Sequence, residues 1–201
     1  MIYIKQYAFV FFFMLLSACS SNNVEEAKDG YILIDSNTKI GAAFKKYPFF
    51  KKISWATCSD ESGRKVIQVV GEYDLEKVRN STPFLISPIE DAAFAPLLSA
   101  AKSLSPNDLD AEYVVQFTRG EEKAGKLFEV EFSGFRFSSS ERAVSKAIEA
   151  LRAETRDAGL RGLSDIYSGN TATIQLMMGA IELASKTPGN IIHRPIGSFN
   201  Q

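Results

Sequence analysis

The chain has 201 residues and a formal net charge of −1, because 23 lysines and arginines nearly balance 24 aspartates and glutamates. This balance gives no basic surface for nucleic acid, whose phosphates dominate its binding by proteins. The length suffices for one domain with a substantial core or for two small ones. Two cysteines and a single histidine provide no paired-cysteine zinc spacing, so we expect neither a metal nor a cofactor.

The N-terminus has the layout of an export signal. One cation, Lys5, is followed by ten uninterrupted apolar or aromatic residues from Tyr7 to Leu16, as in a secretory signal peptide. As a helix, this run would rise about 15 Å, roughly half of the ~30 Å hydrocarbon core that a spanning helix crosses. We therefore do not interpret it as a permanent transmembrane anchor.

The end of this run resembles the lipobox of bacterial lipoprotein precursors: Leu16, Ser17, Ala18 and Cys19. The resemblance implies that residues 1–18 are a removable signal and that Cys19 becomes the acylated first residue of the mature chain. Two or more acyl chains give stable membrane attachment. Ser20, in place of an aspartate, favours the periplasmic face of the outer membrane over the inner membrane. The alternative is an ordinary signal peptide with an incidental cysteine.

The next segment is interpreted as a tether. Residues 20–30 are polar, show no apolar periodicity and end in glycine, which is typical of a linker. Residues 19–30 would then be the lipidated tether, and residues 31–201 a single domain. Within this domain we expect a helical C-terminal part and a tail, at residues 138–187 and 188–201.

The first half of the domain alternates between strands and helices. "YILI" at 31–34 reads as a short buried strand, and the apolar spacing from Ile40 to Tyr47 predicts a helix that Pro48 ends. Two β-rich runs, 51–60 and 64–74, flank "ESG" and predict a hairpin. A helix is expected to start at Pro88 and to be kinked or divided at Pro96.

A second hairpin is predicted from residues 111–119 and 126–137. Phe128, Val130 and Phe132 would share its buried face, in the alternation of a half-buried antiparallel strand. Since Phe135 and Phe137 have the opposite parity, we expect a bulge at the glycine before them.

The remainder is predicted to be helical. Ser138 and Glu141 match a capping box for a helix that Gly159 would end. A last helix, from Thr171 to Lys186, is apolar over more than one face, so we expect it to be core, with a surface for a binding partner as the alternative. The predicted class is α+β, with an antiparallel sheet of about four or five strands covered by helices.

Candidate chemistry is sparse. Neither a phosphate loop, nor a serine elbow, nor a metalloprotease motif appears, and we expect no enzymatic activity. Glu129 and Glu131 could form a carboxylate pair, although strand alternation also explains them, and Cys58 could act with His193 or be a buried inert thiol. The aromatic pair predicted as an exposed partner contact, beside basic doublets, is Phe49 and Phe50.

These observations favour a lipid-anchored envelope lipoprotein. It would act as a non-enzymatic binding or assembly module, attached to the membrane through its N-terminal lipid, with another envelope protein or the cell-wall layer as its partner. One alternative is a lipoprotein that holds an apolar molecule between the sheet and the methionine-bearing helix at 171–186. Another is an unrecognised envelope enzyme with Glu129 or His193 in its site.

Overall fold

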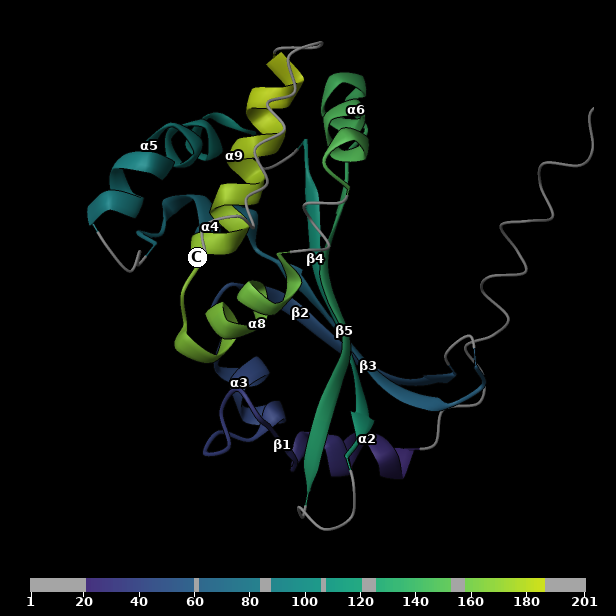
Figure 1. The fold of residues 1–201 in the computed structure, drawn as a ribbon. Helices are drawn as coiled ribbons and strands as arrows, with labels where there is room; N and C mark the ends of the chain where they lie inside the picture. Colours follow the sequence, from purple (N-terminus) through teal and green to yellow (C-terminus); the bar gives the residue numbers. More distant parts are fainter. Residues whose placement is uncertain are drawn as a thin grey trace, which may run out of the picture.

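The computed structural model describes residues 21–59, 62–83, 88–105, 108–120, 126–152 and 158–186. In this part of the chain one five-stranded sheet has the order β1-β5-β4-β3-β2 (Figure 1). Its strands are β1 (Tyr31–Ile32), β2 (Phe50–Ser59), β3 (Lys65–Tyr73), β4 (Asp110–Arg119) and β5 (Leu127–Ser138). Neighbouring strands are antiparallel except for β1, which runs parallel to β5.

Both predicted hairpins are confirmed, as β2–β3 and β4–β5, and so is the α+β class. The sheet is mixed, however, and not purely antiparallel. Tyr31 and Ile32 pair with Leu127 and Phe128, so the first strand joins the sheet beside the last one. Only Tyr31 and Ile32 of the buried strand predicted at 31–34 form β1; Leu33 and Ile34 are exposed, so the second half of that prediction is wrong.

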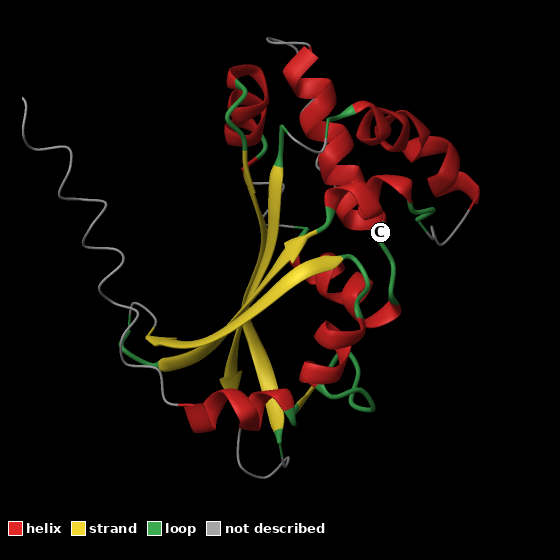
Figure 2. Cartoon of the chain, turned by 180° about the vertical axis from the view of Figure 1, so that it is seen from behind, coloured by secondary structure: helices red, strands yellow, loops and turns green. Residues whose placement is uncertain are grey.

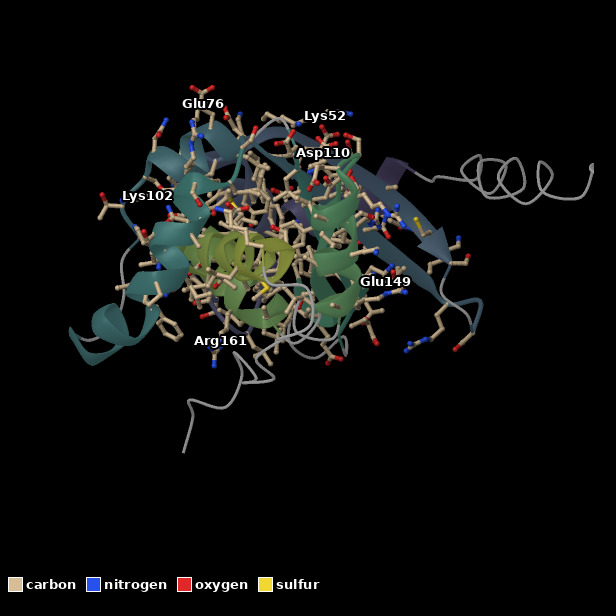
Figure 3. The ribbon with its side chains drawn as sticks, turned by 90° about the horizontal axis from the view of Figure 1, so that it is seen from above. Lys52, Glu76, Lys102, Asp110, Glu149 and Arg161 are labelled. Atoms are coloured by element: carbon tan, nitrogen blue, oxygen red, sulfur yellow. The ribbon has the colours of Figure 1, made fainter. Side chains whose placement is uncertain are left out.

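Helices flank this sheet. They are α2 (Ser21–Lys28), α3 (Ile40–Lys46), α4 (Leu75–Asn80), α5 (Pro88–Ser103), α6 (Arg142–Ala150), α8 (Gly159–Ser168) and α9 (Ala172–Lys186). Figures 1 and 2 show α3, α4, α5, α8 and α9 on one side of the sheet, α2 across its lower end and α6 beyond the upper end of β5. Viewed from above, α9 lies between α5 and α6, with charged residues such as Lys102 and Glu149 at the periphery (Figure 3).

The core lies between the sheet and the helices. Tyr73, Tyr113 and Phe117 project into it from neighbouring strands and are buried. Ile174, Met177, Met178 and Ile181 of the last helix are also buried and belong to the same cluster, where α9 packs against α5, α6 and α8. The prediction that this helix is core is therefore confirmed.

The bulge in β5 lies earlier than predicted. Phe117 pairs with Val130, whereas Gln116 pairs with Phe132, so the extra residue is Glu131 and not the glycine at 134. Phe128 and Val130 face the core, and Phe135 and Phe137 return to it. Phe132, which the sequence analysis placed on the core face, lies on the opposite face instead. The change in aromatic parity was detected correctly, but its position was wrong.

The segment predicted to be a tether contains a helix. Helix α2 occupies eight of its residues, and Ala27 is completely buried in the core. Lys28 lies over the ring of Trp55, with its Nζ 5.7 Å from the ring centroid, and forms an ion pair with Glu25. Ala27 and Lys28 make these contacts with residues that are distant in the sequence. The polar composition of the segment does not reveal such contacts, and it therefore suggested a linker.

The boundaries of the other helices also differ in places. Helix α5 continues through Pro96 as one element. Glu141 is itself the N-cap of α6, with its carboxylate accepting hydrogen bonds from the amides of Ala143 and Val144, so the predicted capping box with Ser138 is wrong. Gly159 begins α8, where an added Cβ would overlap the carbonyl of Ser133. The glycine thus permits close packing of α8 on β5, and it does not end the preceding helix.

Candidate functional site

Phe49 and Phe50, predicted together as an exposed contact, have different surroundings. The ring centroid of Phe50 lies 4.8 Å from that of Tyr47 and 4.9 Å from that of Tyr73, within an aromatic cluster. Phe49 also contacts Tyr47, with the ring centroids 5.4 Å apart. Both phenylalanines are half-buried, but Phe49 borders a recess of about 490 Å³. Phe50 therefore contributes to packing, whereas Phe49 has one side available to a binding partner.

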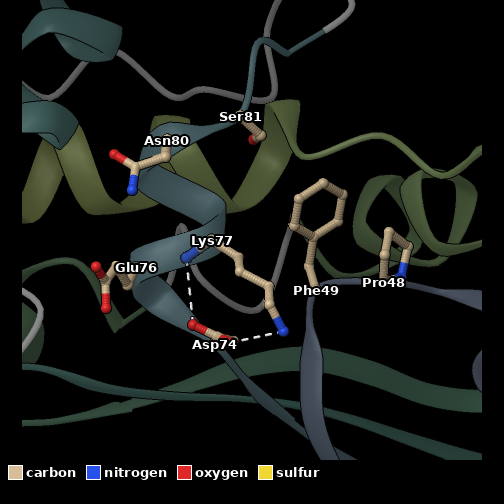
Figure 4. Close-up of a pocket in the computed structure, with 7 residues that line it drawn as sticks. All are labelled: Pro48, Phe49, Asp74, Glu76, Lys77, Asn80 and Ser81. Carbon is tan, nitrogen blue, oxygen red and sulfur yellow. Dashed lines mark hydrogen bonds and ion pairs between the residues drawn. The ribbon is translucent and has the colours of Figure 1, made fainter.

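The recess lies between the start of β2 and helix α4 (Figure 4). It is lined by Pro48, Phe49, Asp74, Glu76, Lys77, Asn80 and Ser81. Pro48 and Phe49, which immediately precede β2, supply an apolar wall. The side chains in and beside α4 supply a rim of both charge signs with an amide. An apolar surface with a few polar groups around it is the usual composition of a binding site.

Asp74 holds the two walls of the recess together. Its amide donates a hydrogen bond to the carbonyl of Phe49, at 2.8 Å. As the N-cap of α4, its carboxylate accepts from the amide of Lys77 at 3.2 Å and forms an ion pair with Lys77 Nζ at 3.0 Å. The Lys77 side chain, and then its amide, lower the pKa of Asp74. The carboxylate thus stays ionised and keeps Lys77 at the rim.

Behind the recess, a polar network connects α4 to α9. Ser81 Oγ lies 2.7 Å from Thr171 Oγ1. Gln175 Nε2 donates to the carbonyls of Val78, at 2.6 Å, and Ser81, at 3.1 Å. Thr171 and Gln175 are buried, so these bonds are shielded from water and stronger than they would be at the surface. The wall formed by α4 is consequently fixed to the core of the domain.

A second polar centre surrounds Asp165 on α8. Its Oδ2 accepts a hydrogen bond from the amide of Thr173 at 2.7 Å, which satisfies a donor at the start of α9. Burial raises the pKa of Asp165, against the lowering effect of the Thr173 hydrogen bonds. Nearby, the Tyr47 hydroxyl donates to the carbonyl of Asn170 at 2.7 Å. The centre joins α3, α8 and α9, and we assign it a structural role.

The other candidate residues do not converge on the recess. Cys58 is half-buried on β2, whereas Cys19 and His193 lie outside the described residues. Glu131 accepts a hydrogen bond from Thr118 at 2.9 Å and pairs with Arg64 at 3.5 Å. The pairing of Cys58 with His193 and a catalytic role for Glu129 both stay untested hypotheses.

Helix α4 was not predicted from the sequence. Residues 64–74 were assigned to a strand, and no further element was expected before Pro88. A signal was nevertheless present, because Asp74 is a favoured N-cap residue and precedes Leu75 and Val78, which are spaced for one face of a helix. Six residues were too short a run to stand out.

No group of three or more histidine, cysteine, aspartate or glutamate side chains in the described part of the chain is arranged to hold a metal ion. None of the helices described is both long enough and apolar enough to span a membrane.

Comparisons of the chain with protein-family models, with curated proteins and with solved structures found no match.

Proposed function

We propose that the chain is a bacterial envelope lipoprotein, anchored through acyl groups on Cys19, which acts as a non-enzymatic binding or assembly module. The observation that carries this proposal is the resemblance of residues 16–19 to a lipobox after an apolar run too short to span a membrane. Ser20 favours the outer membrane, at its periplasmic face.

The recess beside Phe49 is the binding surface that this proposal assigns. A half-buried aromatic ring within a polar rim suits an apolar side chain of a protein partner, because such anchors dominate the energetics of protein interfaces. The hydrogen bond from Asp74 to Phe49 and the network behind α4 keep the site ordered before binding. Ordering in advance reduces the entropy lost on association. We therefore favour another envelope protein over the cell-wall layer as the partner.

The anchor is tested by metabolic labelling with a fatty acid. The wild-type protein should incorporate the label and fractionate with membranes, and Cys19→Ser should abolish incorporation. Equal labelling of the two proteins, or no label on the wild type, would contradict the anchor.

The recess is tested by crosslinking in intact cells. A photoreactive amino acid at the exposed position Asn80 should capture a protein, and Phe49→Ala should reduce this capture strongly. Phe132→Ala is the matched control, because Phe132 is also half-buried but lies on the opposite face of the sheet. Thermal melts of both variants verify folding. Equal capture by the folded Phe49 variant and the control would exclude the recess as the contact.

A further inference from the structure

Two exposed aliphatic residues lie at the centre of a turn after β1. The amide of Asp35 donates to the carbonyl of Ile32 at 3.2 Å, which closes a β-turn around Leu33 and Ile34. Leu33 is 79% exposed and Ile34 is 48% exposed. The central positions of such turns usually hold glycine, proline, asparagine, aspartate or serine. Adjacent branched aliphatic side chains at this place are therefore unusual, and the part of the domain that the structure describes leaves them largely uncovered.

The turn is an ordered feature. Asp35 Oδ1 accepts hydrogen bonds from the amides of Asn37, at 2.8 Å, and Thr38, at 3.2 Å. The amide of Ile40, the first residue of α3, donates to the carbonyl of Gly30 at 2.9 Å. Because both ends of the segment are held, Leu33 and Ile34 are presented to the surroundings in a fixed position.

This turn lies at the same end of the molecule as the N-terminus of the folded domain. In Figures 1 and 2, both α2 and the segment between β1 and α3 are at the lower end of the sheet. Helix α2 begins at Ser21, two positions after Cys19. Two extended residues span only about 7 Å, and an eight-residue helix is about 12 Å long. An acyl anchor on Cys19 would thus hold this end of the domain against the lipid surface.

The acidic side chains of α2 and Asp29 are paired with basic ones, whereas the Asp35 carboxylate in the turn accepts hydrogen bonds from backbone amides. Each carboxylate from Glu25 to Asp29 has a basic partner: Glu25 pairs with Lys28, Glu26 with Arg119, and Asp29 with Lys39. No excess of negative charge from these residues opposes an anionic membrane, and no basic cluster among them attracts one. Contact with lipid would consequently depend on apolar side chains.

We propose that Leu33 and Ile34 form a membrane-contact point that enters the boundary between lipid headgroups and acyl chains, at the same end of the domain as the anchor. This inference rests on the proposed acylation of Cys19. The lipid provides the attachment, and the turn provides a second, rigid point of contact that restricts how the domain is oriented on the bilayer. The side chains of the turn thereby leave water without needing a protein partner.

The test is photolabelling of the mature, acylated protein in vesicles. The vesicles contain phosphatidylethanolamine, phosphatidylglycerol and a phospholipid with a diazirine in its acyl chain. After irradiation, mass spectrometry of the digested protein locates lipid adducts. We expect adducts at Leu33 and Ile34 in several-fold higher yield than at Leu160, which is 58% exposed on α8 and serves as the internal control. Leu33→Ser with Ile34→Ser should remove these adducts without changing the melting temperature.

A yield of lipid adducts at the turn no higher than at Leu160 would overturn the inference. A photoreactive amino acid at position 33 that captures a protein in cells, while the turn forms no lipid adducts, would overturn it as well. The same digest reports the mass of the Cys19 peptide. If the Cys19 peptide is acylated but the turn carries no adducts, only the membrane-contact point is rejected. If the Cys19 peptide of the protein expressed in bacteria is not acylated, the proposed anchor itself is rejected.

Discussion

Ile181 in the middle of α9 offers a direct measure of how much the last helix contributes to the domain. The side chain is completely buried and belongs to the core cluster that includes Met177 and Met178. Ile181→Asp would remove an aliphatic side chain from this core and place a carboxyl group among apolar neighbours.

Two costs determine the expected loss of stability. Burial of an isoleucine side chain contributes about 1.5 to 3 kcal/mol. Keeping the new carboxyl group neutral at pH 7, starting from a pKa near 3.9, costs about 4 kcal/mol, at 1.36 kcal/mol per pH unit. The sum, roughly 6 to 7 kcal/mol, approaches the whole folding free energy of many domains, which is about 5 to 15 kcal/mol. We therefore expect Ile181→Asp to be largely unfolded or barely stable.

Denaturant unfolding of this variant beside Leu183→Asp is the assay. Leu183 belongs to the same helix but is 42% exposed, so the same new side chain can stay hydrated there and should cost about 1 kcal/mol or less.

The pH dependence provides a second measure. Burial would raise the pKa of the carboxyl group introduced by Ile181→Asp, so its penalty is smallest below the unfolded pKa and grows as the pH rises. The difference from wild type should shrink by about 2.7 kcal/mol between pH 7 and pH 5. Equal costs for Ile181→Asp and Leu183→Asp would refute the assignment of Ile181 to the core.

Three further predictions concern other parts of the domain. Protein that starts at Ser21 should unfold with the same midpoint in oxidising and reducing buffer, because Cys58 would be its only thiol; a large shift on reduction would contradict this. Burial raises the pKa of Asp165 above 3.8, so its contribution to stability should decline as the pH rises from 3.8 through the raised value, and Asp165→Asn should flatten the measured stability curve in that window. Gly179→Ala should destabilise the domain by about 1 to 3 kcal/mol, because its Cβ would overlap the backbone of Leu97 on α5. A calorimetric melting temperature at or above that of the wild type would show that α5 and α9 can move apart without loss of stability.

The local elements of the fold could be predicted from the sequence because their patterns are strong. Alternating residues identified both hairpins, and the apolar residues of α9 identified a core helix. The bulge at Glu131 illustrates the limit of this approach. Parity shows that one residue is inserted between Phe128 and Phe135, but its position depends on which hydrogen bonds of β4 are satisfied.

Features that depend on distant contacts were not accessible in this way. Helix α2 owes its place to the burial of Ala27 and the packing of Lys28 on Trp55, and a polar sequence does not reveal either contact. No recess was predicted, and of the residues that line it only Phe49 was predicted as a contact. Phe49 was selected for its position after a proline, but its counterpart Asp74 comes from the far end of β3, and only the hairpin brings the two together.

The parallel pairing of β1 with β5 has a consequence for the order in which the domain can form. Tyr31 pairs with Leu127, which lies 96 positions later in the chain. Because closing so long a loop costs entropy, we expect this contact to form late in folding. In a chain delivered from its N-terminus, the segment next to Cys19 emerges first but has nothing to pair with until β5 arrives. If Cys19 is acylated, the acylating enzymes would therefore meet an open, extended substrate, and completion of the sheet's edge would come after the lipid is in place.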